Sequence, residues 1–251
     1  HHAQKIQVVL VDDALADERF PEPVEQAGPE RRVHQDHGHA RGLAGLDQRH
    51  HLDQFVEQLK GYLAIPSISA LPEHAADVRR CAEWTGAELT RIGLHGARLV
   101  ETPGHPVVYA EWLGAAGAPT ILFYGHYDVQ PVDPLDLWTS PPFEATVRDG
   151  ELYARGAVDD KGQVFMHMKA IEAHLSQTGS LPVNIKVVLE GEEEVGSANL
   201  DDFIKANKDL LKADVVVISD SPMFDRDVPS ICYGLRGLAY FQIDVRGSKS
   251  D

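Results

Sequence analysis

The chain has 251 residues, of which 43% are hydrophobic and 25% charged, so it can build one large or two small globular domains around a buried core. Its formal net charge of −16 argues against nucleic acid and anionic membrane as partners, because both would repel it. No apolar run approaches the ~20 residues of a membrane span, the first residues show no signal-peptide pattern, and only two cysteines occur, which together predict a cytoplasmic protein with reduced thiols.

Residues 1–49 differ from the rest of the chain. They contain one aromatic residue, Phe20, and no sustained apolar period beyond the short run 6–10. Three closely spaced histidines, His34, His37 and His39, could imitate a metal site, but nothing nearby would hold them in place. We therefore expect 1–49 to be a disordered or foreign segment, and 50–251 to form the folded part.

From residue 50 onward the apolar residues follow regular periods. Helical spacing predicts helices over 52–63, 78–92, 162–175 and 198–206. Apolar runs predict strands over 106–113, 119–124, 183–189 and 214–219, strand pairing over 231–245, and a hairpin turning at 148–150. Several of these strands are continuously apolar, as strands covered on both faces are. The alternation predicts an α/β fold with a mostly parallel central sheet and helices on both faces.

Side chains that bind metals follow three of the predicted strands. His126 lies just beyond the predicted strand 119–124, Glu193 and Glu194 follow the strand 183–189, and Asp220 directly follows the strand 214–219. In an open α/β sheet the carboxyl ends of the strands border the ligand crevice, so we expect these side chains to meet at one edge. One neutral imidazole with hard carboxylates suits Zn²⁺, Mn²⁺ or Co²⁺ in a site that keeps a water.

Two further carboxylate positions complete the pattern. Asp159-Asp160 precedes the helix predicted at 162–175, where the partial positive charge of a helix N-terminus favours carboxylates. Asp128 lies two residues after His126, where it can accept the second N–H of a ligating imidazole. Each element alone is weak, but their order at successive strand ends predicts a hydrolytic metal site. A phosphate-binding protein is not favoured, because no strand leads into a glycine-rich phosphate loop.

These motifs closely resemble the dinuclear zinc aminoacylase and dipeptidase family, which includes acetylornithine deacetylase, succinyl-diaminopimelate desuccinylase, glutamate carboxypeptidase and the carnosinase-type dipeptidases. The resemblance runs from about Leu52 to Asp251 and implies a zinc-peptidase-like fold. The segments 125–131, 138–143, 149–153 and 233–237 are most similar to the dipeptidase branch. The implied activity is dipeptide hydrolysis; the runner-up is deacylation of N-acyl amino acids, and a third alternative is an inactive truncated fragment.

The resemblance also implies a role for each site residue. His126 and Asp220 would bind the first of two zinc ions, with Mn²⁺ or Co²⁺ as alternatives, and Glu194 would bind the second. Asp159 would bridge both ions, and we expect the peptide bond between Asp159 and Asp160 to be cis. Asp128 would orient His126, and Glu193 would be the general base that takes a proton from a bridging water.

Two neighbouring groups have no such role. Glu192 would have no direct part, and His167 and His174, within the helix predicted at 162–175, are expected to be packing or surface residues.

Family members continue after a segment like 244–251 with a lid domain, which usually dimerises, and supply two more histidines to the site. The resemblance therefore implies a homodimer through that lid. It also implies that this polypeptide alone would bind one metal ion weakly and hydrolyse little.

Overall fold

A mixed β-sheet forms the centre of the protein in the computed structural model, which describes residues 6–10, 48–221, 228, 231–232, 234 and 237. Among these residues seven strands join in the order β2-β3-β7-β4-β8-β1-β9. The strands are β1 (Ile6–Leu10), β2 (His95–Val100), β3 (Val107–Trp112), β4 (Thr120–His126), β7 (Asn184–Glu190), β8 (Val215–Ile218) and β9 (Ile231–Cys232). The central strands β7, β4 and β8 run parallel, whereas β3 joins β7 and β1 joins β8 in antiparallel fashion.

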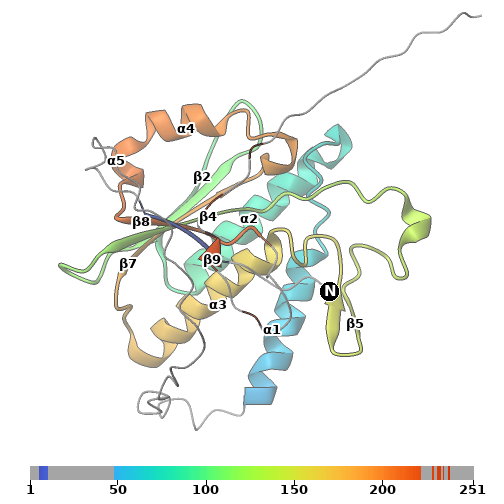
Figure 1. Cartoon of the computed structure of the whole chain (residues 1–251), viewed down its shortest axis with the longest axis horizontal. Helices are drawn as coiled ribbons and strands as arrows, with labels where there is room; N and C mark the ends of the chain where they lie inside the picture. The colour runs from blue at the N-terminus through green and yellow to red at the C-terminus, as the bar shows by residue number, and fades with distance from the viewer. Residues whose placement is uncertain are drawn as a thin grey trace, which may run out of the picture.

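Helices cover both faces of this sheet (Figure 1). The helices are α1 (Gln48–Leu63), α2 (Ala75–Arg91), α3 (Lys161–Thr178), α4 (Leu200–Ala206) and α5 (Lys208–Leu211). The larger core lies between α1, α2, α3 and one face, where alternate β7 residues such as Val187 and Leu189 are buried. The smaller core lies on the other face, where Val188 and Phe203 pack together near α4 and α5. This alternation is why β7 reads as a continuous apolar run.

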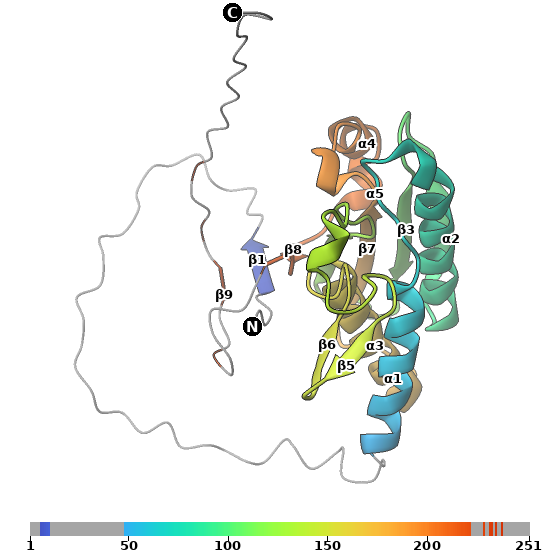
Figure 2. The same cartoon turned by 90° about the vertical axis from the view of Figure 1, so that its right-hand side faces the viewer.

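The predicted fold class is confirmed, and most predicted elements lie within a few residues of their expected positions. The helix predicted at 162–175 continues to Thr178 and ends at Gly179, whose φ of 69° is the left-handed conformation that glycine adopts readily. The predicted hairpin is β5 (Thr146–Arg148) with β6 (Glu151–Tyr153), and it lies apart from the main sheet (Figure 2). Its turn residues Asp149 and Gly150 have φ of 52° and 79°, as a tight hairpin requires.

The ends of the chain are described only in part. Within 1–49 the described residues include β1, which pairs with β8 (Gln7 opposite Ile218) although the sequence shows only a short apolar run there. Within the strand region predicted at 231–245 the structure describes β9, which runs parallel to β1; the remainder of that region lies outside the described residues. The described residues contain no helix long and apolar enough to span a membrane.

Candidate metal centre

The site is built around His126, the last residue of β4. β4 lies between β7 and β8 in the sheet, so the side chains that follow those strands reach the same edge. The imidazole is fully buried. Its Nε2 atom lies 3.1 Å from Asp159, 3.6 Å from Asp220 and 3.9 Å from Glu193, in each case measured to a carboxylate oxygen. The residues expected to meet at this edge are therefore brought together.

The donor atoms fall into two overlapping groups that each suit a cation. One contains His126, Glu193 and Asp220, the other His126, Asp159 and Glu194, and within each group the ligand atoms lie within 4.8 Å of one another. An imidazole with carboxylates is a donor set that Zn²⁺ accepts. The grouping differs in one respect from the expected roles, because Glu193, expected as a base, also lies among potential ligands.

Asp128 contacts both His126 and the backbone of the loop that carries Glu193 and Glu194. It is fully buried, and its Oδ1 lies 3.3 Å from Nδ1 of His126, while its backbone carbonyl lies 3.0 Å from the same nitrogen. Its carboxylate also accepts the backbone N–H groups of Glu193 and Glu194, at 3.3 and 3.2 Å, and the hydroxyl of Ser69 at 2.6 Å. The sequence suggested only the contact with His126; the contacts with the Glu193 loop come from the fold.

Asp160 is a site residue for which the sequence suggested no role. Its side chain is 1% exposed, its Oδ2 accepts the backbone N–H of His126 at 3.1 Å, and its Oδ1 has no hydrogen-bond partner among the described residues. The peptide bond between Asp159 and Asp160 is cis, as expected. The two neighbouring carboxylates therefore point in different ways: Asp159 lies against the imidazole, and Asp160 lies against the backbone of β4.

Negative charge outweighs positive charge at this edge, and the pKa values reflect it. Burial and the charges of Asp220 and Asp159 raise the pKa of Asp160 to about 8, despite His126. Burial together with Asp220 and Glu194 likewise raises the pKa of Glu193 to about 7. Burial lowers the pKa of His126, but the carboxylates of Asp128, Asp159 and Asp220 more than reverse this and raise it well above its usual range. Such a cluster favours added cations.

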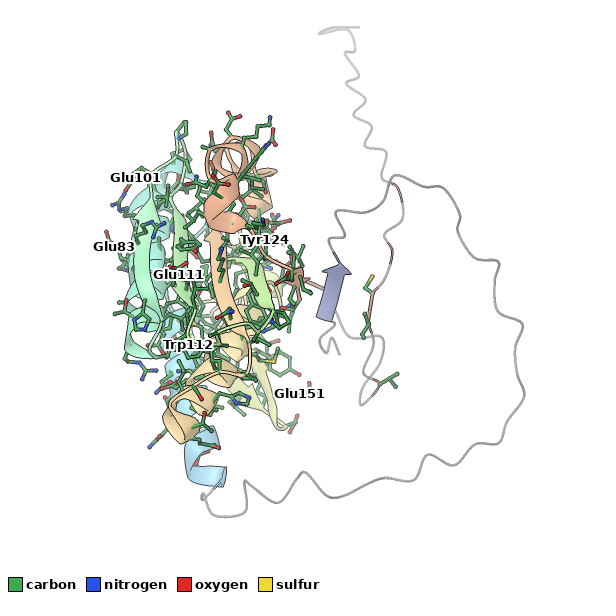
Figure 3. All side chains as sticks on the ribbon, turned by 90° about the vertical axis from the view of Figure 1, so that its left-hand side faces the viewer. Glu83, Glu101, Glu111, Trp112, Tyr124 and Glu151 are labelled. Atoms are coloured by element: carbon green, nitrogen blue, oxygen red, sulfur yellow. The ribbon has the colours of Figure 1, made fainter. Side chains whose placement is uncertain are left out.

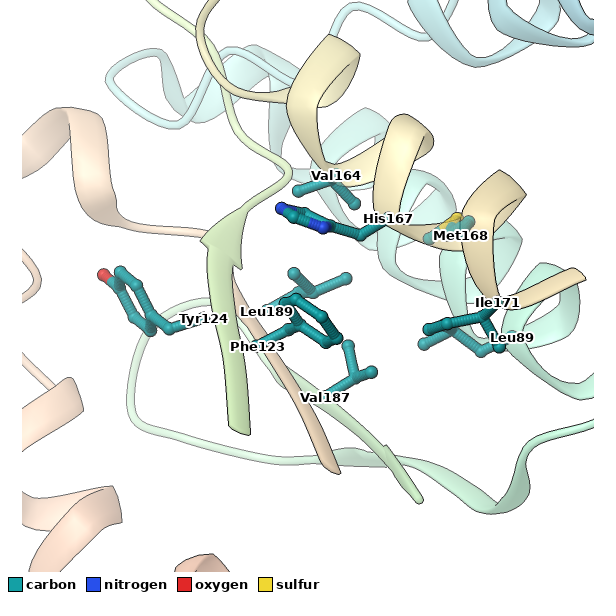
Figure 4. A pocket seen from close by; sticks show the side chains of 9 residues that line it. All are labelled: Leu89, Phe123, Tyr124, Val164, His167, Met168, Ile171, Val187 and Leu189. Atoms are coloured by element: carbon teal, nitrogen blue, oxygen red, sulfur yellow. The ribbon is translucent and has the colours of Figure 1, made fainter. Parts of the chain in front are cut away.

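The remaining candidates lie away from the ligand atoms. The carboxylate of Glu192 accepts two hydrogen bonds from the amide of Asn199, at 2.9 and 3.1 Å. The ring of His167 packs against that of Phe123, tilted by 33° with ring centroids 4.4 Å apart, and its Nε2 lies 2.7 Å from the hydroxyl of Ser219. It lines an apolar pocket between α3 and the sheet (Figure 4), where burial lowers its pKa to about 4. His174 is exposed on α3.

Gly125 is required by the close approach of Asp160 to β4. A Cβ atom there would lie 2.5 Å from Oδ2 of Asp160 and 2.9 Å from a methyl group of Val164. We expect Gly125→Ala to destabilise the protein by about 1–3 kcal/mol, because neither buried group can move away freely. Urea unfolding measures this. Gly61→Ala is the control: Gly61 is helical with nothing within 4 Å of its Cβ position, so alanine should stabilise by roughly 0.5–1 kcal/mol. Equal shifts in both variants would contradict this account.

An α/β core that delivers an imidazole and several carboxylates to one sheet edge places the protein in the class of α/β domains with a candidate metal site at the ends of their strands. Residues 122–245 match the model of peptidase family M20/M25/M40. The chain is 37% identical to the Cys-Gly metallodipeptidase dug1 of Schizosaccharomyces pombe in an alignment 211 positions long that covers 79% of this chain and 44% of that protein. It is 36% identical to the Beta-Ala-His dipeptidase of Homo sapiens in an alignment 215 positions long that covers 80% of this chain and 42% of that protein.

Solved structures agree with the sequence relatives. The structure of human carnosine dipeptidase 1 superposes with a TM-score of 0.63 at 37% identity, over 69% of this chain and 39% of that one. The M20 family metallo-carboxypeptidase Sso-CP2 of Sulfolobus solfataricus gives a TM-score of 0.59 at 44% identity, over 64% and 36%. The chain carries a peptidase M20 family domain and is homologous to these metallodipeptidases, which confirms the resemblance drawn from its motifs. It spans less than half the length of these relatives.

Proposed function

We propose that the protein is a zinc-dependent dipeptidase. The observation that carries this proposal is the convergence of Asp159, Glu193 and Asp220 on Nε2 of His126 within 3.1–3.9 Å. A complete site would hold two metal ions. Their ligands in this chain would be His126, Asp159, Asp220 and Glu194. When bound, zinc supplies Lewis-acid chemistry, polarising a carbonyl and acidifying water.

The residues of this chain would orient the site and move protons. Asp128 holds the imidazole through Nδ1, so Nε2 faces the carboxylates. Glu193 takes a proton from the attacking water and passes it to the leaving amine. Its carboxylate suits this role because its side chain is 38% exposed, and in the metal-free protein burial and the charges of Asp220 and Glu194 raise its pKa to about 7.

Relatives named as Cys-Gly and Beta-Ala-His dipeptidases support a dipeptide substrate. The test is hydrolysis by the zinc-loaded full-length protein of a panel of dipeptides, including Cys-Gly and β-Ala-His, compared with N-acetylated amino acids. We expect cleavage of dipeptides and at least tenfold slower release of acetate, or none. Preferential deacetylation would replace the proposal by an N-acyl amino acid deacylase, and no turnover of either class with zinc bound would contradict both.

The finer properties implied by the resemblance belong to the same proposal. We propose a homodimer formed through a lid domain and a cytoplasmic location. Zinc is the proposed metal, with Mn²⁺ or Co²⁺ able to take its place, since both accept the same imidazole and carboxylate donors.

Zinc binding should release protons at neutral pH. In the metal-free protein the pKa of His126 is raised well above its usual range by its carboxylate neighbours, so the imidazole carries a proton at pH 7. Zinc needs the neutral ring, so this proton must leave, and affinity should rise with pH until the pH exceeds that pKa. Calorimetry in buffers of different ionisation enthalpy counts the protons; we expect at least one released per first zinc ion, because the cation also lowers the raised pKa values of Asp160 and Glu193. A pH-independent affinity between pH 6 and 8 would contradict this.

A further inference from the structure

Glu190 is a buried carboxylate outside the proposed ligand set. It is the last residue of β7, it is 2% exposed, and its Cα lies opposite that of His126 in the parallel pair of β4 and β7. By strand alternation it shares a sheet face with Val188, the face covered by α4 and α5. A carboxylate has no packing advantage at such a position, so its hydrogen bonds must account for it.

Three hydrogen bonds tie Glu190 to the segment that carries His126 and to Ser197, at the end of the turn that carries Glu193. Its Oε1 accepts the hydroxyl of Tyr124, on β4, and the hydroxyl of Ser197, the latter at 2.9 Å. Its backbone carbonyl accepts the N–H of Tyr127 at 2.9 Å. Two hydroxyl donors on one oxygen suit an acceptor-only group, which an ionised carboxylate is. Glu190 thus joins the strand that carries His126 to the end of the turn that carries Glu193.

A backbone hydrogen bond also closes the turn between Glu190 and Ser197. The N–H of Ser197 donates to the carbonyl of Glu192 at 2.8 Å. Ser197 has a φ of 51°, a left-handed conformation uncommon for a residue other than glycine. That conformation coexists with the bond from its hydroxyl to Glu190, so the turn is fixed by side chain and backbone together. Glu193 and Glu194 lie inside this closed segment.

We propose that Glu190 is a positioning residue: through Tyr124 and Ser197 it holds the 191–197 turn so that Glu193 and Glu194 face His126. This deepens the proposed function and rests on it for the roles of Glu193 and Glu194. Asp128 holds the same turn from the other side, through the N–H groups of Glu193 and Glu194. The turn is therefore fastened at its base by Glu190 and at its middle by Asp128.

The test uses four variants in the full chain: Tyr124→Phe, Ser197→Ala, Ser197→Gly and Glu190→Met, which keeps roughly the size of the side chain but removes both acceptor oxygens. Tyr109→Phe is the matched control, because the hydroxyl of Tyr109 donates to Glu111 at 2.5 Å in a similar tyrosine–glutamate pair on β3 (Figure 3 labels Glu111 and Tyr124). Ser197→Gly separates the two functions of Ser197, since glycine accepts the left-handed backbone but has no hydroxyl.

Hydrogen exchange of the metal-free protein is the first measurement. In the four variants we expect the amides of 191–197 to exchange about tenfold faster, with β3 and β7 unchanged, because a local tether is lost. Tyr109→Phe should leave 191–197 unchanged. Unchanged exchange there in Glu190→Met and Tyr124→Phe would overturn the proposal, as would a uniform increase across the sheet. A tolerated Ser197→Gly would show that the backbone conformation, and not the bond to Glu190, fixes the turn, which also overturns it.

Co²⁺ binding, followed by its visible absorption, is the second measurement. We expect about tenfold weaker binding and a changed spectrum in the four variants, comparable with the loss of an outer partner of a metal ligand, and no change in Tyr109→Phe. If the unsubstituted protein takes up no Co²⁺, the proposed function fails, while the exchange experiment still decides the role of Glu190. Unchanged Co²⁺ spectra and affinities in all four variants, in a protein that binds Co²⁺, would overturn the positioning role.

Discussion

Replacing His126 by alanine should weaken zinc binding by more than ~100-fold, beyond the 10–100-fold that loss of an outer partner of a metal ligand typically costs. His126 belongs to both groups of donor atoms, so its removal takes a ligand from each. It also removes a buried imidazole whose Nε2 lies 3.1 Å from Asp159 and 3.6 Å from Asp220. The remaining carboxylates would repel one another and move apart.

Isothermal titration with zinc measures this effect, with circular dichroism to show that the variant is folded. His174→Ala is the matched control, because His174 is exposed on α3 and should leave zinc binding unchanged. If His126→Ala kept its affinity within a few-fold while folded, the metal centre would have to lie elsewhere. The histidine-rich segment 34–39 would then be the next candidate, and deleting it would settle the question.

The fold could be predicted largely because β4, β7 and β8 are central strands. A strand covered on both faces must be apolar throughout, and this leaves a clear run in the sequence. β2 was not predicted: it is an outer strand with three exposed residues among its six, so its apolar residues do not form a regular pattern. The pairing of β1 with β8 was also not predicted, because which strands become neighbours depends on the tertiary fold and not on local periodicity.

The site could be predicted where a residue's chemistry shows in its local pattern. His126 and Asp220 follow buried strands, and strand ends converge by the geometry of the sheet. Asp160 and Glu190 gave no such sign, because their partners are backbone groups and hydroxyls far away in the sequence: the N–H of His126 for Asp160, and Ser197 and Tyr124 for Glu190. Long-range hydrogen bonds of this kind become visible only in the folded chain.

Glu193 should be the most sensitive residue for turnover. It lies 3.9 Å from Nε2 of His126, yet its side chain is 38% exposed, so a substrate and water can reach it. Glu192, immediately before it, bonds to Asn199 instead, at 2.9 Å. The two neighbours therefore offer a matched pair: the same substitution, one residue apart, on carboxylates with different partners.

We expect Glu193→Gln to lower kcat by ~10²–10⁴-fold with little change in KM or zinc content, because glutamine keeps the shape but cannot accept the proton. Glu192→Gln should leave kcat nearly unchanged. In the metal-free protein the pKa of Glu193 is raised to about 7 by burial and by Asp220 and Glu194. Bound cations oppose that repulsion, so the acid limb of kcat/KM should lie below pH 7 and change in Glu193→Gln.

Loss of zinc from Glu193→Gln would instead make Glu193 a ligand, consistent with its place in one donor group. Turnover within tenfold of the unsubstituted protein would rule out the base role, so the metal content and the rate of this one variant together separate ligand from base.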